Sequence, residues 1–191
     1  MVRFLAFGVC ALMLSACERQ QVAVNDFWLR MSGLCGQAFE GRLVSWDEAD
    51  AYFATQRLVM MVRDCSDAEI HIPFMVGADD TRTWVLSRGE EGVLLRHYHR
   101  QRPNAPEPIT DYGGALVEDG TGSRLEFAVD ATTLALFEEE GLAESAANVW
   151  AIEVKPSQDL FAYEMARPGR FFRLEFDTSE TVPYAPADDA G

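Results

Sequence analysis

Two histidines separated by a single residue have the clearest potential for metal chemistry in this sequence. His97 and His99 lie in an alternating segment, so on a β-strand both imidazoles would share one face. Met61 and Met75 lie in neighbouring segments that are also predicted to be strands. Imidazole nitrogens combined with thioether sulfurs suit a soft ion such as Cu(I). We favour the simpler interpretation, in which the histidines face solvent and the methionines fill gaps in packing, so no bound metal is expected.

Aromatic side chains in the alternating segments form a second candidate site, a lining for a lipid-like ligand. A barrel of about eight strands either encloses one small ligand or is filled by its own side chains. An apolar inward face serves both purposes, and a packed core is the commoner outcome. The aromatic candidates are Trp84, Trp150, Phe161, Tyr163 and Phe172.

Motifs typical of enzymes are missing from the sequence. It contains no HExxH motif, no CxxC pair, no GxSxG elbow and no phosphate-binding glycine loop. Gly120-Thr121-Gly122 lies between two predicted strands and indicates a turn. The sequence therefore predicts a protein that is not an enzyme, unless the fold gathers His97, His99 and a carboxylate in one cleft.

Two cysteines in the body of the chain, Cys35 and Cys65, predict a disulfide in an oxidising compartment. Closing a loop of about thirty residues should stabilise the fold by roughly 3–4 kcal/mol on the chain-entropy model. The alternative makes Cys65 a reactive thiol. Asp64, Asp67 and Glu69 surround it in sequence with negative charge, which opposes the thiolate.

The amino terminus has the pattern of an export signal. Arg3 precedes an unbroken apolar run of about eleven residues, which is shorter than the roughly 20 needed to cross a bilayer as a helix. Residues 1–16 are therefore predicted to be a signal peptide. The run ends in Leu14-Ser15-Ala16-Cys17, which resembles the lipobox of bacterial lipoproteins. The resemblance implies cleavage before Cys17, a diacylglyceryl group on its thiol and acylation of the freed amine; an ordinary signal peptide or a buried apolar helix is the alternative.

The acyl chains that this resemblance implies would hold the protein almost permanently on a membrane, because a single chain anchors only marginally. Glu18 follows the cysteine, at the position where Asp in Gram-negative lipoproteins commonly signals inner-membrane retention. We therefore expect a lipid-anchored protein of the cell envelope, on the outer membrane facing the periplasm rather than on the inner membrane.

The charge of the chain excludes one class of partner. Its formal net charge is −15, from 16 basic and 31 acidic side chains. Such a surface repels nucleic acid and anionic headgroups. No nucleic-acid partner is expected, and the membrane anchor must act through acyl chains rather than through a basic patch.

Alternation of apolar and polar residues predicts a mainly β protein. Strands are expected at 39–45, 57–63, 70–76, 82–88, 92–99, around Tyr112, at 123–129 and 148–154, and on both sides of the Pro168-Gly169 turn. Pro73 cannot donate to a ladder, so its strand is at an edge or bulged. Ser45 and Glu48 have capping-box spacing for a short helix over 46–54, and Asp130 and Gly141 bracket a second helix.

About nine short strands without a βαβ rhythm predict an antiparallel meander that closes into a lipocalin-like β-barrel with one or two short helices. A two-sheet β-sandwich is the alternative. The expected organisation is a signal peptide over 1–16, a lipidated amino terminus and polar tether over 17–26, one β-rich domain over 27–177 and a disordered acidic tail over 178–191.

Several sequence blocks within 32–177 resemble an uncharacterised family of secreted bacterial proteins. Members often carry His at the positions of Met61 and Met75 and a richer His cluster near His97, so this chain's departure weakens any shared metal site. The resemblance implies no activity. The blocks are Arg57-Leu58-Val59-Met60-Met61-Val62-Arg63, Ile72-Pro73-Phe74, Arg82-Thr83-Trp84-Val85-Leu86, Tyr112-Gly113-Gly114, Asn148-Val149-Trp150-Ala151 and Arg167-Pro168-Gly169-Arg170-Phe171-Phe172-Arg173.

These observations favour a non-enzymatic envelope lipoprotein that binds an apolar small ligand or an envelope partner. A structural or assembly lipoprotein, acting by protein contact, is the alternative. A copper-binding protein or a hydrolase has less support.

Overall fold

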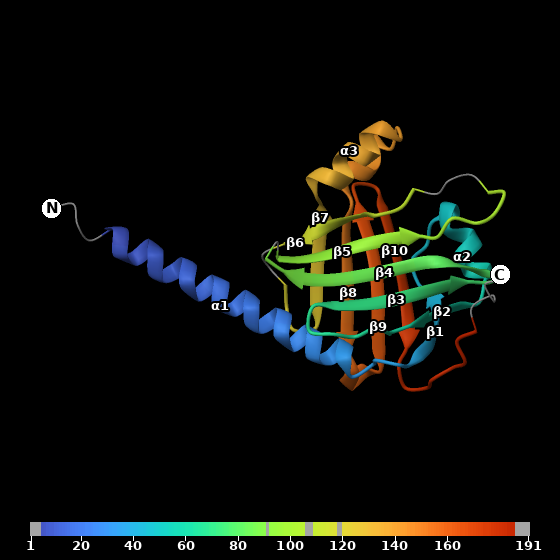
Figure 1. The fold of residues 1–191 in the computed structure, drawn as a ribbon, viewed down its shortest axis with the longest axis horizontal. Coiled ribbons are helices and arrows are strands. Elements are labelled where there is room, and N and C mark those ends of the chain that lie inside the picture. Colours follow the sequence, from blue (N-terminus) through green and yellow to red (C-terminus); the bar gives the residue numbers. More distant parts are fainter. Residues whose placement is uncertain (1–4, 91, 106–108, 118–119, 186–191) are drawn as a thin grey trace.

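Ten antiparallel strands form a closed barrel in the computed structural model, which describes residues 5–90, 92–105, 109–117 and 120–185. Each strand pairs with the next along the chain, and β10 pairs with β1 to close the ring (Figure 1). The meander barrel is therefore confirmed, and the sandwich is not formed. The strands are β1 (Ala38–Leu43), β2 (Leu58–Met61), β3 (Glu69–Val76), β4 (Asp79–Gly89), β5 (Gly92–His99), β6 (Tyr112–Leu116), β7 (Arg124–Val129), β8 (Val149–Lys155), β9 (Leu160–Arg167) and β10 (Arg170–Asp177).

The barrel has two unlike ends. The lower end, where β1 begins, is covered by helix α1 (Leu5–Ser32). The upper end carries the short helix α2 (Ala51–Thr55), the helix α3 (Ala131–Glu139) and the turns that join β3 to β4 and β9 to β10. In Figure 1 the blue α1 comes from the left and ends at the lower part of the barrel, whereas α3 lies at the top and α2 at the right.

The carboxyl-terminal part of α1 closes the lower end by packing into the barrel. Val24, Phe27, Trp28 and Met31 are buried members of the hydrophobic core. Their spacing of three, one and three residues places them on one face of a helix. The indole nitrogen of Trp28 donates to the carbonyl oxygen of Ser66 at 3.0 Å. The base of the barrel is thus sealed by a helix that belongs to the core.

The segment 17–26, predicted to be a polar tether, lies within this helix. These residues are helical and continuous with Leu5–Ser32. Of this segment Val24 is buried, and it begins the series of core residues that continues with Phe27, Trp28 and Met31. No described helix has both the length and the mean hydropathy needed to cross a bilayer.

The two predicted helices form at the upper end, one of them with a different cap. Before α2 lies a 3-10 helix, η1 (Glu48–Asp50), which is capped by the Asp47 carboxylate accepting from the Ala49 amide. The hydroxyl of Ser45, predicted as the cap, accepts from the Arg173 amide instead. The Asp130 cap of α3 is confirmed, since its carboxylate accepts from the Thr133 amide at 2.9 Å.

Strand β6 approaches both neighbours closely because it contains two glycines. A Cβ atom at Gly113 would overlap the carbonyl oxygen of Leu95, and one at Gly114 would overlap that of Ala128. The amide of Gly113 also donates to the hydroxyl of Thr133 on α3. The adjacent Gly113-Gly114 pair therefore lets β6 fit between β5 and β7 beneath α3.

The Pro73 prediction is confirmed as an irregularity in β3. The β2–β3 ladder ends at Phe74, and the β3–β4 register shifts between Phe74 and Val76. An isolated bridge between Arg63 and His71 resumes the pairing beyond the proline. The strand is inside the closed ring, so the irregularity consists of an interrupted ladder towards β2 at Pro73 and a register shift towards β4 just beyond it, not of a sheet edge.

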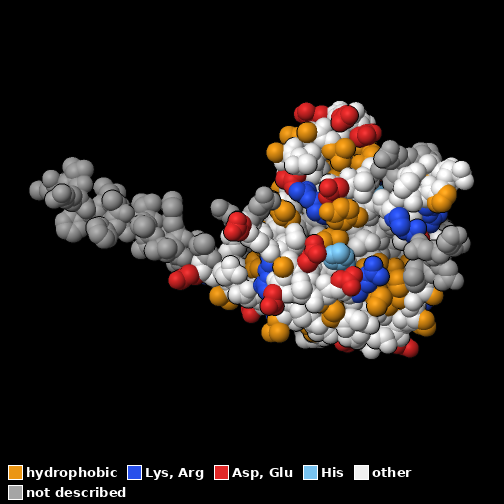
Figure 2. Space-filling model, in the orientation of Figure 1, with side chains coloured by type: hydrophobic (Ala, Val, Ile, Leu, Met, Phe, Trp, Pro, Cys, Tyr) orange, Lys and Arg blue, Asp and Glu red, His pale blue; other side chains and the backbone are white. Residues whose placement is uncertain are grey.

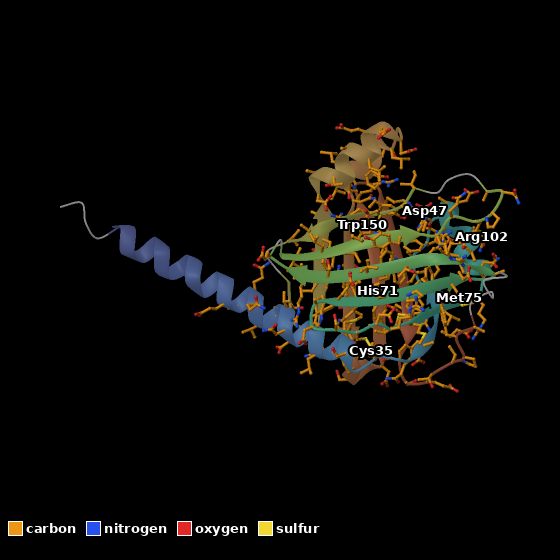
Figure 3. All side chains as sticks on the ribbon, viewed as in Figure 1. Cys35, Asp47, His71, Met75, Arg102 and Trp150 are labelled. Atoms are coloured by element: carbon orange, nitrogen blue, oxygen red, sulfur yellow. A yellow bond between two sulfur atoms is a disulfide. The ribbon has the colours of Figure 1, made fainter. Side chains whose placement is uncertain are left out.

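The Cys35–Cys65 disulfide and the segment that follows β10 also lie at the lower end of the barrel. Cys35 and Cys65 form the predicted disulfide, with Cα atoms 6.3 Å apart, and Figure 3 shows Cys35 near the base of the barrel. In the predicted tail, residues 178–185 contain no helix or strand, yet the amide of Val182 donates to the carbonyl oxygen of Ala38. The remaining part, 186–191, lies outside the described residues.

Candidate functional site

A cavity of about 550 Å³ opens at the upper end of the barrel. The inward side chains of the lower half, such as Phe161, Leu174 and Phe176, are fully buried and pack against one another. The inward side chains of the upper half, many of them aromatic, surround an open space. The barrel is therefore filled below and hollow above, and the hollow part is within the size range of small-molecule sites.

Stacked aromatic rings form one wall of this cavity. The Trp84 ring lies between Phe74 and Tyr163, with ring centroids 4.7 and 4.3 Å away and nearly parallel planes. Trp150 and Tyr112 also line the cavity, from β8 and β6, and their ring centroids lie 5.1 and 4.8 Å from that of His97. Stacking of this kind holds each ring in one orientation. The wall is thus apolar and rigid.

His97 is the buried polar group in this wall. Its Nδ1 atom lies 3.2 Å from the carbonyl oxygen of Tyr112, and its Nε2 atom lies 2.7 Å from the Tyr163 hydroxyl. A carbonyl oxygen only accepts, so Nδ1 carries the proton and Nε2 accepts from the hydroxyl. Burial lowers the pKa of His97 to about 3 and raises the pKa of Tyr163 well above its ordinary value. Both groups are therefore neutral at pH 7 and hold each other in place.

A neutral buried histidine makes stability depend on pH. The unfolded imidazole takes up a proton near pH 6.5, whereas folded His97 does so only near pH 3. Its contribution is therefore fully present above pH 6.5 and is lost by about 1.4 kcal/mol per pH unit as the pH falls towards 3. We expect His97→Gln to remove most of the roughly 2 kcal/mol stability loss between pH 7 and pH 5, measured by urea unfolding. The partly exposed His99 is the control: His99→Gln should retain most of that loss, and an unchanged slope in His97→Gln would contradict the assignment.

Three arginines at the entrance give the cavity a polar rim. Arg170 is paired with both carboxylate oxygens of Asp50, at 2.5 and 2.6 Å, and with Asp47 at 3.0 Å. Arg82 pairs with Asp79 at 2.9 Å. Arg167 donates to the hydroxyl of Ser145 and the side-chain oxygen of Asn148, at 3.3 and 3.2 Å. Figure 3 marks Asp47 and Arg102 on this side of the barrel.

The predicted aromatic lining is only partly assembled at the cavity. Trp84, Trp150, Tyr163 and Phe172 line it. Phe161 does not, because it lies one inward position below Tyr163 on β9 and packs against Phe176 in the filled half, with ring centroids 5.8 Å apart.

The proposed histidine and methionine constellation is not assembled. His97 and His99 both line the cavity, as their shared face predicts, but the expectation that both face solvent is wrong for His97, which is buried. Met61 and Met75 follow the core residues Met60 and Phe74 on their strands and so point to the outer face. Among the described residues, no group of three or more His, Cys, Asp and Glu side chains could hold a metal ion.

The sequence interpretation missed the three arginines of the rim. A signal was available in the sequence, because three strands, β4, β9 and β10, carry an arginine near their upper ends. Arg82 shares its face with Trp84, Arg167 with Tyr163, and Arg170 follows the turn. Asp50 was also missed. It reaches the cavity from the short helix η1, and the alternation of residues along the strands does not show how that helix is oriented.

Comparisons with protein-family models, with curated proteins and with solved structures gave no match for this chain.

Proposed function

We propose that this protein is an envelope lipoprotein that binds a small, largely apolar molecule in the upper cavity of the barrel. The observation that carries the proposal is the contrast between the two halves of one barrel. Aliphatic and aromatic side chains fill the lower half, whereas seven aromatic side chains and an immobilised His97–Tyr163 pair surround open space in the upper half. A rigid apolar cavity with a few fixed polar groups is typical of a ligand site.

The position of the proposed lipid anchor supports this function. Cys17 lies seven positions before Val24, the first core residue of α1, and this separation spans about 10 Å of helix. The anchor would therefore sit close to the closed end of the barrel, and the entrance would face away from the membrane (Figure 1). The lipobox resemblance and the likeness to secreted bacterial proteins agree with a place in the envelope, on the outer membrane facing the periplasm.

An enzymatic role has less support, although the cavity gathers His97, His99 and the carboxylate of Asp50. Both ring nitrogens of His97 are engaged, and both oxygens of Asp50 accept from Arg170. A general base needs a free lone pair within reach of a substrate. These contacts favour binding over catalysis.

Exposed aromatic residues favour protein contact as a second candidate function. The Trp46 side chain is fully exposed, and Tyr52 and Phe171 are about half exposed. Trp46 lies between β1 and η1, Tyr52 lies in α2, and Phe171 lies at the start of β10. Aromatic rings of this kind are enriched in protein interfaces, so an assembly role would use the surface beside the entrance.

Filling the cavity should abolish binding. We expect native mass spectrometry of the full chain, isolated gently from cell envelopes, to show a reproducible non-covalent adduct. Met165 lines the cavity, so Met165→Trp should reduce the adduct to background by occupying its space. Met75→Trp, the same change on the outer face of β3, should retain it. An adduct that survives Met165→Trp would place the ligand elsewhere, and a bare unsubstituted protein would favour the assembly role.

A further inference from the structure

The cavity entrance is basic in a strongly acidic protein. The chain has a net charge of −15, and acidic side chains gather over α3 in Figure 2. Of the described side chains that line the cavity, Arg82, Arg167 and Arg170 are cationic and Asp50 is the single carboxylate. A cleft lined by one sign of charge within low-dielectric walls concentrates ions of the opposite sign.

The three arginines differ in how completely their charge is compensated. Arg170 is neutralised by two carboxylates, Asp50 and Asp47. Arg167 has neutral partners and one carboxylate at 3.7 Å, that of Glu144, whose side chain is 90% exposed. A surface ion pair of this kind contributes little. Arg167 therefore retains most of its charge at the entrance.

Arg82 is the least satisfied of the three. Its partner Asp79 is shared with Arg102, which pairs with the other carboxylate oxygen at 3.0 Å. The Nε atom of Arg82 is buried and has no hydrogen-bond partner. Leaving a buried donor unpaired is costly, so this guanidinium has unused capacity for an acceptor.

The charge of Arg82 also reaches the interior of the cavity. The side chain lies one inward position above Trp84, whose ring stacks on Tyr163. Burial lowers the pKa of His99, and the charge of Arg82 lowers it further. Arg82 therefore stands at the boundary between the aromatic wall and the entrance.

We propose that the ligand is an amphipathic anion, whose apolar body lies among Trp84, Trp150 and Tyr163 and whose carboxylate or phosphate head is bound by Arg82. Arg167 attracts the head at the entrance. This inference rests on the proposed function, since it names the ligand class of the same cavity. Guanidinium binds both kinds of head through paired, charge-assisted hydrogen bonds.

The test compares three probes with the same tail: decanoate, decyl phosphate and decanol. Each is titrated by calorimetry into the full chain carrying Cys17→Ser, which cannot accept a lipid. We expect at least one anion to bind about tenfold or more tightly than decanol, the range for a hydrogen bond to a charged group. The stronger of the two anions assigns the head as carboxylate or phosphate.

Single substitutions then show which side chain causes the preference for an anionic head. Arg82→Gln should reduce the anion affinity to that of decanol and leave decanol binding unchanged. Arg42→Gln, on an exposed side chain of β1 remote from the cavity lining, should keep the preference. Equal binding of all three probes to the unsubstituted chain would overturn the anionic head and leave the proposed function standing. Binding of none of them would overturn the proposed function itself.

Discussion

Replacing Phe27 with alanine is expected to lower the free energy of unfolding by about 3–5 kcal/mol, the usual cost of deleting a buried phenylalanine ring. The side chain is fully buried in the lower end of the barrel and packs in one cluster with Trp28 and Met31. The substitution would leave a cavity beneath the core that the closed ring of strands cannot collapse to fill. Urea unfolding followed by tryptophan fluorescence would measure the loss.

The same helix provides the control. Leu29 lies two residues further along α1 and is 74% exposed, so Leu29→Ala should change stability by no more than about 0.5 kcal/mol. If α1 were only a tether, both variants would be neutral. Equal effects of the two substitutions would therefore contradict the role of α1 as part of the core.

Removing the Cys35–Cys65 disulfide is expected to lower the free energy of unfolding by about 3–4 kcal/mol. The two cysteines are 30 residues apart, and the bond joins the segment after α1 to the loop between β2 and β3. In the unfolded chain it closes a loop that includes all of β1 and β2. The loss of this restraint acts mainly by increasing the entropy of the unfolded state.

The double variant Cys35→Ser/Cys65→Ser tests this without leaving an unpaired thiol at the site. Urea unfolding of the unsubstituted chain in excess reductant should show the same loss as the double variant under oxidising conditions. Reductant should have no effect on the double variant. A double variant as stable as the oxidised chain would show that folding of the lower end is independent of the bond.

Most of the barrel could be predicted because strand alternation is a local signal. The inward series on β9, with Phe161, Tyr163 and Met165, is visible in the sequence and fixes which face is buried. The helix over 17–26 was missed for a physical reason. Among the side chains of 18–26 only Val24 is buried, three of the four core residues described in α1 follow position 26, and the preceding apolar segment has a composition that is typical of an export signal.

The candidate site could be predicted only in part, because alternation gives the face of a side chain but not its depth in the barrel. Trp84 and Phe161 have the same inward orientation, yet one lines the cavity and the other packs below it. Depth depends on the register between strands, which is set by pairings such as that of Trp84 with His97. The pairing of Arg170 with Asp50 joins residues 120 positions apart, and no local pattern reports it.

Because α1 and the packed lower half close the other end, the cavity opens at the upper end of the barrel. A bound molecule must therefore leave by the route through which it arrived. A side chain that narrows this route without touching the bound molecule would slow arrival and departure by the same factor. The residence time of the ligand would then lengthen while its equilibrium affinity stayed constant, so exchange kinetics and binding strength are separately adjustable in this fold.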